Sequence, residues 1–244
     1  MGIFVVSQDT IVPTLNAFVA RSGICSRRKA VDLIQAGMIT VDGEVIKDPA
    51  HRLQAESKVM YKNAILAPEK KLYILLNKPV GYISTASDPE NRPHVVSLVK
   101  TPQQTRIYPI GRLDQDTTGL ILLTNDGYFA QKLAHPQFNV NKTYHATLDR
   151  PLADEDFTKL QKGVLLKDGF FKPDALYALS KDRCTLGIKL HSGKNRIIRR
   201  FFQSQGYYVI KLDRMVYANL EKKGLKKGSW RFLNRYEIRE LQSI

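Results

Sequence analysis

The segment Arg106–Gly127 constrains the fold more than any other part of the chain, because it encloses a short polar loop between two apolar runs. Arg106–Ile110 has the apolar and β-branched content of a strand, and Leu120–Leu123 is a continuous apolar run of buried-strand character. Gly111 permits a sharp turn after the first run. The loop that follows presents Asp114, and its residue type alone leaves open whether this aspartate does chemistry or bonds its own backbone as a turn former.

The chain from Leu72 onwards shows a mixture of strand and helix patterns. Further strand-like runs occur at Leu72–Leu76, Thr143–Leu148, Thr185–Leu190 and Tyr207–Lys211, and helix-like runs occur at Tyr128–Leu133, Glu155–Lys162 and Ile197–Ser204. They do not alternate regularly, as they would in a doubly wound sheet. The pattern predicts an α+β domain over residues 72–244 with a mixed or antiparallel sheet.

A smaller unit over residues 1–63 precedes this domain. Two amphipathic helical patterns, the second with Ser26 as its expected N-cap, are followed by a hairpin pattern around Asp42-Gly43, a dipeptide that suits a type I′ turn. The segment Ala64–Lys71 contains a proline and a charged end, and a strand pattern begins directly after it. We therefore predict a linker over residues 64–71.

The charge of the chain is strongly positive and unevenly distributed. Its 38 Lys and Arg residues against 23 Asp and Glu give a formal net charge of +15. Residues 1–66 carry 8 basic and 6 acidic side chains, whereas residues 181–235 carry 15 and 3. A charge of this size points to a polyanionic partner, although a run such as Lys222–Lys227 is by itself equally typical of a solvated face.

Several chemical classes find no support in the sequence. The two cysteines, Cys25 and Cys184, lie far apart, and neither they nor the five histidines have the spacing of a metal site or a disulfide framework. No glycine-rich phosphate-binding motif is present, so we expect no metal and no small-molecule cofactor. No stretch approaches the roughly 20 apolar residues of a membrane span, and Met1–Asp9 lacks a secretory pattern. A cytoplasmic monomer is the default expectation.

Four motifs resemble those of one enzyme family. Residues 111–127, GRLDQDTTGLILLTNDG, resemble the pattern G-R-L-D-x-x-T-x-G-L-L-L-L-T-N-D-G of the bacterial ribosomal pseudouridine synthases of the RsuA/RluB type. Residues 78–81 are similar to the K-P-x-G motif of that family, residues 142–144 to K-x-Y, and residues 193–200 to G-K-N-R-Q-I-R-R. Ile197 departs from the last motif, because it stands where the family usually has Gln, and this puts a polar contact in doubt.

The resemblance implies an architecture and a partner. The architecture is a bifurcated, mainly antiparallel sheet with the active cleft between its two halves. The first unit resembles a small RNA-binding domain first known from a small-subunit ribosomal protein, in which Arg27, Arg28 and Lys29 would present cations at a helix start. Such cations bind phosphate without reading sequence. Thr14 and Ala17 stand where that domain usually has basic residues, so a weaker RNA affinity is expected.

The resemblance also implies a reaction, the isomerisation of a uridine in ribosomal RNA to pseudouridine. By resemblance Asp114 is the catalytic carboxylate, Arg199 is its ion-pair partner and Tyr144 packs on the target base. Whether Asp114 acts as a nucleophile at C1′ or abstracts a sugar proton stays open. An enzyme that acts on a base must take the base out of the stack, and Arg112 resembles the family arginine that occupies the vacated space.

The remaining basic residues of these motifs are expected to contact the substrate. Lys142, Lys194, Arg196 and Arg200 are interpreted as phosphate contacts, and Lys78 is expected at the wall of the substrate site.

The particular RNA is suggested by two loops. Residues 88–93 and His135-Pro136 resemble loops of the large-subunit branch of the family more than those of the small-subunit branch. Large-subunit ribosomal RNA, or a ribosomal precursor particle, is therefore the expected partner.

Two other functions compete with this interpretation. One is a non-catalytic RNA-binding or ribosome-assembly factor, which the charge and the small first unit would also suit. The other is a metal-dependent nuclease that uses Asp114, Asp116 and Asp126. Asp126, however, lies in an Asn-Asp-Gly turn and is expected to cap the helix at Tyr128.

Overall fold

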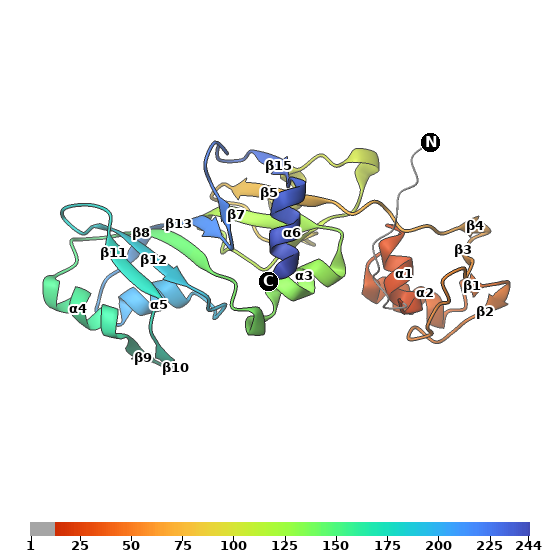
Figure 1. The fold of residues 1–244 in the computed structure, drawn as a ribbon, viewed down its shortest axis with the longest axis horizontal. Helices are drawn as coiled ribbons and strands as arrows, with labels where there is room; N and C mark the ends of the chain where they lie inside the picture. Colours follow the sequence, from red (N-terminus) through yellow and green to blue (C-terminus); the bar gives the residue numbers. More distant parts are fainter. Residues whose placement is uncertain (1–12) are drawn as a thin grey trace. The chain divides into compact units, whose positions relative to one another are not determined.

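The computed structural model describes residues 13–244, which form two compact units. The boundary between the units falls between Lys71 and Leu72. The segment Met1–Asp9, where the sequence lacks a secretory pattern, lies outside the described residues. Figure 1 shows the path of the chain through each unit.

The first unit combines two helices with a small antiparallel sheet. Its elements are α1 (Leu15–Arg21), α2 (Arg27–Gln35), β1 (Ile39–Val41), β2 (Glu44–Val45), β3 (Val59–Tyr61) and β4 (Ala64–Ile65). The sheet has the order β2-β1-β3-β4. Ser26 accepts a hydrogen bond from the Lys29 amide, as predicted for an N-cap. Asp42 and Gly43 have φ values of 53° and 92°, as a type I′ turn requires.

Residues 64–71 belong to the first unit, so the prediction of a linker there is wrong. β4 pairs with β3 through a second two-residue turn of positive φ, at Lys62 and Asn63. Leu66 is buried in the core of the unit, and the Glu69 amide donates to the Arg21 carbonyl. A strand of two residues is too short to produce a periodic sequence pattern, and this explains the error.

The second unit is a mixed α+β domain. Its strands are β5 (Tyr73–Lys78), β6 (Tyr108–Ile110), β7 (Thr117–Thr124), β8 (Lys142–Leu148), β9 (Val164–Leu166), β10 (Gly169–Phe171), β11 (Ala175–Ala178), β12 (Thr185–Leu190), β13 (Val209–Tyr217), β14 (Leu220–Glu221) and β15 (Trp230–Phe232). Its helices are α3 (Gly127–Ala134), α4 (Asp154–Lys162), α5 (Ile197–Gln203) and α6 (Arg235–Ser243), with short 3-10 turns at Val95–Leu98, Pro102–Gln104 and Pro136–Phe138.

The large sheet is antiparallel except at its centre. Its strand order is β11-β12-β8-β13-β7-β5-β15, with β14 added to β13 and β6 added to β7. β7 and β13 run parallel, with Leu212 opposite Thr117 and Arg214 opposite Gly119, and the other neighbouring pairs are antiparallel. β9 and β10 form a separate hairpin. The predicted fold class is confirmed: a mixed, mainly antiparallel sheet follows a small helix-hairpin unit.

Two hydrophobic cores stabilise this sheet. On one face of β5 and β7, Leu75 and Leu122 pack with Phe129 of α3 and Leu241 of α6. The second core takes the opposite face of these strands and continues beneath α5, where Phe202 is fully buried. Figure 1 shows α3 and α6 beside β5 and β7, and α5 beside β12. No helix in the described part of the chain has the length and apolar character needed to cross a membrane.

Candidate active site

A pocket of about 280 Å³ opens in the second unit. Its walls come from the loop after β6, from β8 and β13, and from the loop that leads into α5. The fold thus brings together motifs that are far apart in the sequence, on both sides of the parallel β7–β13 pair. The predicted site residues that line the pocket are Arg112, Asp114, Lys142, Tyr144, Lys194, Arg196 and Arg199.

The loop that carries Asp114 is held by hydrogen bonds to the segment that follows β5. The Ser84 hydroxyl donates to the Leu113 carbonyl at 2.8 Å and accepts from the Leu113 amide at 3.0 Å. The Gly81 amide donates to the Gln115 carbonyl at 2.9 Å, and the Gln115 side chain donates back to the Gly81 carbonyl at 3.1 Å. These bonds on both sides of Asp114 fix the loop without a regular element.

Lys78 lies beneath this loop and is fully buried, so the predicted contact with substrate is wrong. Its ammonium group donates to the Thr117 carbonyl at 2.7 Å, to the Pro79 carbonyl at 3.1 Å and to the Gln115 carbonyl at 3.4 Å. Burial lowers the pKa of Lys78 to about 8, while two nearby aspartates act in the opposite direction. Lys78 therefore supports the catalytic loop from inside the fold.

The ion pairs of the pocket differ from the sequence prediction. Arg196, and not Arg199, pairs with Asp114: its Nη1 lies 3.0 Å from Asp114 Oδ2. Arg199 pairs with Asp116 instead, with 3.0 Å between Nη2 and Oδ2, and its Nη1 donates to the Val209 carbonyl at 2.5 Å. Both aspartates of the loop are thus held by arginines of the segment 196–199.

The start of α5 explains this arrangement. Ile197, Ile198, Phe201 and Phe202 are buried, which leaves Arg199 and Arg200 as the polar residues of the first turn. Arg196 is the N-cap and has a left-handed backbone, with φ 45°. This conformation is uncommon for a residue other than glycine and is found where the surroundings fix it. Ile197 forms part of the pocket wall, so apolar packing takes the place of the polar contact that Gln would make.

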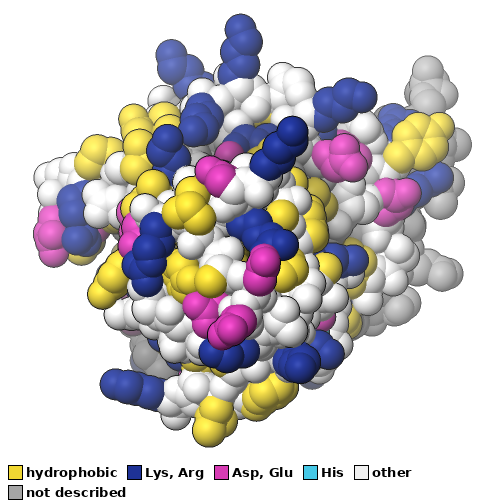
Figure 2. Space-filling model, turned by 90° about the vertical axis from the view of Figure 1, so that its left-hand side faces the viewer, with side chains coloured by type: hydrophobic (Ala, Val, Ile, Leu, Met, Phe, Trp, Pro, Cys, Tyr) yellow, Lys and Arg dark blue, Asp and Glu magenta, His cyan; other side chains and the backbone are white. Residues whose placement is uncertain are grey.

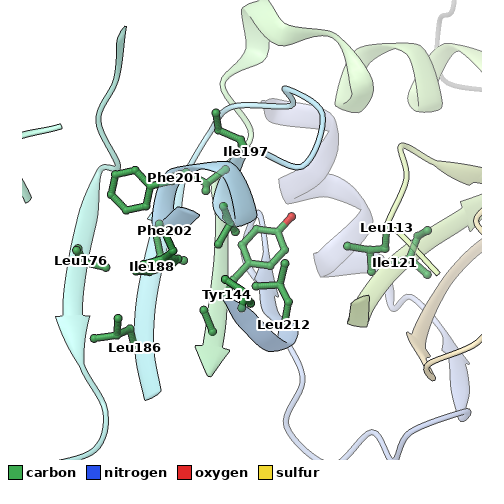
Figure 3. Packing of buried hydrophobic residues seen from close by; sticks show 14 of the residues in the cluster. Leu113, Ile121, Tyr144, Leu176, Leu186, Ile188, Ile197, Phe201, Phe202 and Leu212 are labelled. Atoms are coloured by element: carbon green, nitrogen blue, oxygen red, sulfur yellow. The ribbon is translucent and has the colours of Figure 1, made fainter. Parts of the chain in front are cut away.

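Tyr144 lies on β8 and is 8% exposed. Cross-strand pairing places it opposite Ile188 on β12 and Arg214 on β13. Figure 3 shows its ring beside Leu212, with the hydroxyl pointing away from Leu186 and towards the side on which Leu113 lies. The hydroxyl is 3.4 Å from Arg214 Nη1. The packing therefore fixes the ring, while its polar end reaches the pocket.

Arg214 lines the pocket, and the sequence analysis did not select it. It is 2% exposed, and its Nε donates to the Leu120 carbonyl at 2.6 Å. The guanidinium group lies over the rings of Tyr217, at 4.9 Å, and Tyr144, at 6.0 Å. The available signal was Arg214 itself, between Leu212 and Met215-Val216 in a stretch of strand character, because a charge in a buried strand requires a stabilising partner or a function.

Two further cations of the pocket differ in their surroundings. Arg112 is exposed and forms no hydrogen bond or salt bridge with any other described residue. The Lys142 ammonium donates to the His191 carbonyl at 3.2 Å. Burial, and secondarily the charge of Arg214, lowers the pKa of Lys142 to about 8. The pocket therefore contains one lysine whose charge is sensitive to pH near neutrality.

Lys194 and Arg200, predicted as phosphate contacts, are both bonded to Asp168 of the β9–β10 turn. Arg200 binds its carboxylate through two bonds of 2.7 and 3.1 Å, and Lys194 donates to its carbonyl at 2.8 Å. The Arg200 guanidinium lowers the pKa of Asp168. Figure 2 shows many other Lys and Arg side chains on the face that carries this end of the domain, with a few acidic groups among them.

The predicted site residues of the first unit form a separate group. Arg27, Arg28 and Lys29 are all exposed at the start of α2. Lys29 makes a salt bridge of 3.6 Å with Asp32, and both of these side chains are more than 60% exposed. Such a contact contributes little to stability, so the three cations are accessible to a polyanion.

The third carboxylate of the nuclease alternative lies outside the pocket lining. Asp126 is 7% exposed, caps α3 by accepting from the Phe129 amide as predicted, and accepts a hydrogen bond from the Tyr73 hydroxyl at 2.8 Å. Among the residues that the structure describes, no group of three or more His, Cys, Asp or Glu side chains is arranged to hold a metal ion.

Comparison with known proteins places this geometry in a family. Residues 72–204 match the RNA pseudouridylate synthase family, and residues 14–59 match the S4 domain. The chain belongs to the RNA pseudouridylate synthase family. The family match covers the pocket walls up to α5. Arg214 lies beyond the matched residues.

Related synthases cover nearly the whole chain. The "Ribosomal large subunit pseudouridine synthase B" of Bacillus subtilis (strain 168) is 39% identical over 94% of this chain and 96% of its own length. The "Ribosomal small subunit pseudouridine synthase A" of Escherichia coli (strain K12) is 34% identical over 82% of this chain and 87% of its own. A crystal structure of a pseudouridylate synthase has a TM-score of 0.67 at 27% identity, and the match covers 93% of this chain and 99% of that one.

Proposed function

We propose that this enzyme converts a specific uridine of large-subunit ribosomal RNA to pseudouridine, with Asp114 as the essential carboxylate. The single observation that supports the proposal is the position of Asp114. Its carboxylate is hydrogen-bonded to Arg196, its loop is held by hydrogen bonds on both sides, and it lies in a pocket that also contains Tyr144. The choice of RNA rests on the loops at 88–93 and 135–136 and on the name of the Bacillus subtilis relative.

The reaction requires the uridine to leave the base stack. Extrusion of a nucleotide costs a few kcal/mol, and a group that fills the gap lowers that cost. Arg112 is suited to this task, because it lies two residues before Asp114 on the same loop and has no partner among the described residues. The extruded base then enters the pocket and packs on Tyr144.

Asp114 acts on the sugar of the extruded nucleotide. Either its oxygen attacks C1′, or it removes a proton from the sugar; in both cases the C1′–N1 bond breaks, the base turns, and C5 bonds to C1′. In the first case the bond between Asp114 and C1′ breaks as the C5–C1′ bond forms, and in the second the proton returns from Asp114 to the sugar. The proton at C5 is finally lost and N1 gains one, so the product is an isomer of the substrate. The bond from Arg196 aims the carboxylate, and Tyr144 contacts the base during the loss of the C5 proton.

The first unit supplies affinity for the folded RNA. Its Arg27, Arg28 and Lys29 are assigned to phosphate contacts, and residues 1–71 are assigned to RNA docking while residues 72–244 carry the chemistry. The working form is proposed to be a monomer, because one chain supplies every group of the pocket.

Asp114→Asn tests this proposal. Asparagine keeps the shape of the side chain and removes the anionic oxygen that both mechanisms need, so product formation should fall by about a thousandfold or more while RNA affinity changes little. Tritium release from C5-labelled uridine in ribosomal RNA measures the reaction. Asp116→Asn is the matched control, and it should keep measurable activity. Near-normal release by Asp114→Asn would contradict the proposal.

Mapping identifies the RNA. Carbodiimide adducts read by reverse transcription in cells with and without the protein should show one missing pseudouridine in large-subunit RNA. A missing site in small-subunit RNA would correct the choice of subunit, and an unchanged map would favour a non-catalytic binding factor.

A further inference from the structure

We propose that Arg214 stabilises the negative charge on the uracil base while the base is detached from the sugar. The inference rests on the proposed function and adds a group to it that the sequence motifs do not contain. A buried cation that borders the pocket and lacks an anionic partner carries the argument.

The bonds of Arg214 leave one nitrogen of its guanidinium group without a partner among the described residues. Nε is bonded to the Leu120 carbonyl and Nη1 contacts the Tyr144 hydroxyl. Nη2 is buried and has no hydrogen-bond partner among the described residues. No described carboxylate forms a salt bridge with Arg214. Arg199, which is 12% exposed, differs in this respect, because it forms a salt bridge with Asp116.

Burying an arginine without an anionic partner lowers the stability of the fold unless a ligand in the pocket interacts with its charge. Arginine stays charged in proteins, so it cannot escape burial by losing a proton. A buried N–H without an acceptor costs about 1–3 kcal/mol, and an unpaired buried charge costs more. Its charge acts across the pocket wall, since it contributes to the lowered pKa of Lys142. The site therefore favours an anion or an electron-rich oxygen in the pocket.

The size and burial of the site indicate which part of the RNA supplies that group. A guanidinium group that is 2% exposed cannot reach a phosphate on the surface of a folded RNA, whereas exposed side chains such as Arg112 can. Only a group that enters the pocket meets Arg214. In the proposed reaction that group is the extruded uracil.

The chemistry supplies the required charge. When the C1′–N1 bond breaks, its electron pair remains on the base, which becomes an anion delocalised over its ring nitrogens and carbonyl oxygens. This holds whether the Asp114 carboxylate bonds to C1′ or takes a sugar proton. An N–H donor that waits for a developing charge lowers the barrier without reorganising during the reaction. Arg214 places a fixed positive charge at the pocket wall, and its Nη1 lies 3.4 Å from the Tyr144 hydroxyl.

Arg214→Gln and Arg214→Lys test the inference in single-turnover reactions. The first removes the charge, and the second keeps it but loses the planar fork. Loss of one such donor lowers rates by about a hundredfold to a thousandfold, so we expect this loss for Arg214→Gln, a smaller loss for Arg214→Lys, and RNA affinity within about twofold of wild type.

A second substrate separates this role from a structural one. RNA with 5-fluorouridine at the target carries a base that leaves more readily as an anion, because fluorine withdraws electrons. The defect of both variants, measured as the disappearance of N-linked 5-fluorouridine after nuclease digestion, should be at least tenfold smaller on this RNA than on uridine RNA. Arg150→Gln is the matched control: Arg150 also lies over a tyrosine, Tyr207, at 4.4 Å, but outside the pocket lining.

The outcomes are distinct. A variant that is equally slow on both substrates, or whose rate stays within threefold of wild type, overturns the inference while the proposed function stands. If Arg214→Gln fails to fold, Arg214→Lys decides by the same comparison. If wild-type protein forms no pseudouridine in any ribosomal RNA, the proposed function falls and the inference falls with it.

Discussion

Arg196 and Arg199 lie within one helical turn of each other; Arg196 contacts Asp114 at 3.0 Å, and both arginines contact Asp116, Arg196 at 3.7 Å and Arg199 at 3.0 Å. Arg196 is 43% exposed and holds Asp114, the proposed catalytic group. Arg199 is 12% exposed and ties Asp116 and the Val209 carbonyl together. We therefore assign Arg196 to the orientation of Asp114, and Arg199 to the stability of the loop that carries Asp116.

This difference predicts opposite effects of two similar substitutions. Arg196→Gln should lower the rate by about tenfold to a hundredfold, because Asp114 loses its orientation, and should change the free energy of unfolding by less than about 0.5 kcal/mol. Arg199→Gln should lower the free energy of unfolding by about 1–3 kcal/mol, because the buried contacts of Arg199 lose their donor. Urea unfolding and tritium release measure the two effects, and a reversed pattern would contradict the assignment.

Lys142 predicts a pH dependence of catalysis. Its pKa is lowered from 10.5 to about 8, so the pocket loses a positive charge as pH rises through 8. Product formation at subsaturating RNA should therefore decline above pH 8. The unfolded chain binds more protons between pH 8 and 10.5, so Lys142 by itself should make stability increase over that range. Lys142→Arg keeps its charge and should abolish the decline in rate. A profile unchanged by this substitution would rule Lys142 out.

Elements with a clear sequence pattern or turn signal were predicted from the sequence, and several others were not. The continuous apolar run at Leu120–Leu123 correctly predicts the centre of β7, and the pattern at Tyr128–Leu133 correctly predicts α3. The hairpin of β9 and β10 has only three residues in each strand and was missed. α6 was also missed, although Asn234 and Glu237 form a capping box that is visible in the sequence.

The site was predictable to a similar degree. The family resemblance selected Asp114, Tyr144 and Arg199 as catalytic residues and Arg196 as a phosphate contact, and the fold brings all four into one pocket. The resemblance assigned Arg199 as the partner of Asp114, whereas Arg196 forms that ion pair, because the two arginines lie within one helical turn and the left-handed backbone of Arg196 directs its side chain. The burial of Lys78 was equally hidden, since a lysine that ends a strand is usually exposed.

The parallel pair of β7 and β13 depends on one glycine. Gly119 has φ +110°, and a Cβ atom there would overlap the backbone of Arg214. Gly119→Ala should therefore separate the two strands and lower the free energy of unfolding by about 3 kcal/mol or more. Gly111→Ala is the matched control: Gly111 has φ +70° but no atom near its Cβ position, so it should cost only about 1 kcal/mol. If both substitutions lowered the free energy of unfolding by the same amount in denaturant titrations, the close approach of Gly119 to the Arg214 backbone would not be what requires glycine.

At the scale of the whole molecule, the chain forms two units, and each has a hydrophobic core of its own. The first unit has its own core, with Leu15, Ile34 and Leu66 buried, and the second contains every residue of the pocket lining. The excess of positive charge at 181–235 is visible in the sequence. The assignment of residues 64–71 to the first unit required the structure, because Leu66 is buried in the core of that unit although the sequence pattern predicts a linker there.

Cutting the chain between Lys71 and Leu72 should give a folded catalytic domain. It should retain product formation on a short RNA that contains the target and lose about a hundredfold in affinity for the full ribosomal substrate, because one of two linked RNA contacts is gone. In the intact chain, changing Arg27, Arg28 and Lys29 together to Gln should reduce the log–log salt slope of binding by about 2. Circular dichroism checks the fold and filter binding checks the affinity. If the truncated protein is folded and binds full ribosomal RNA as tightly as the intact chain, the first unit does not dock the substrate.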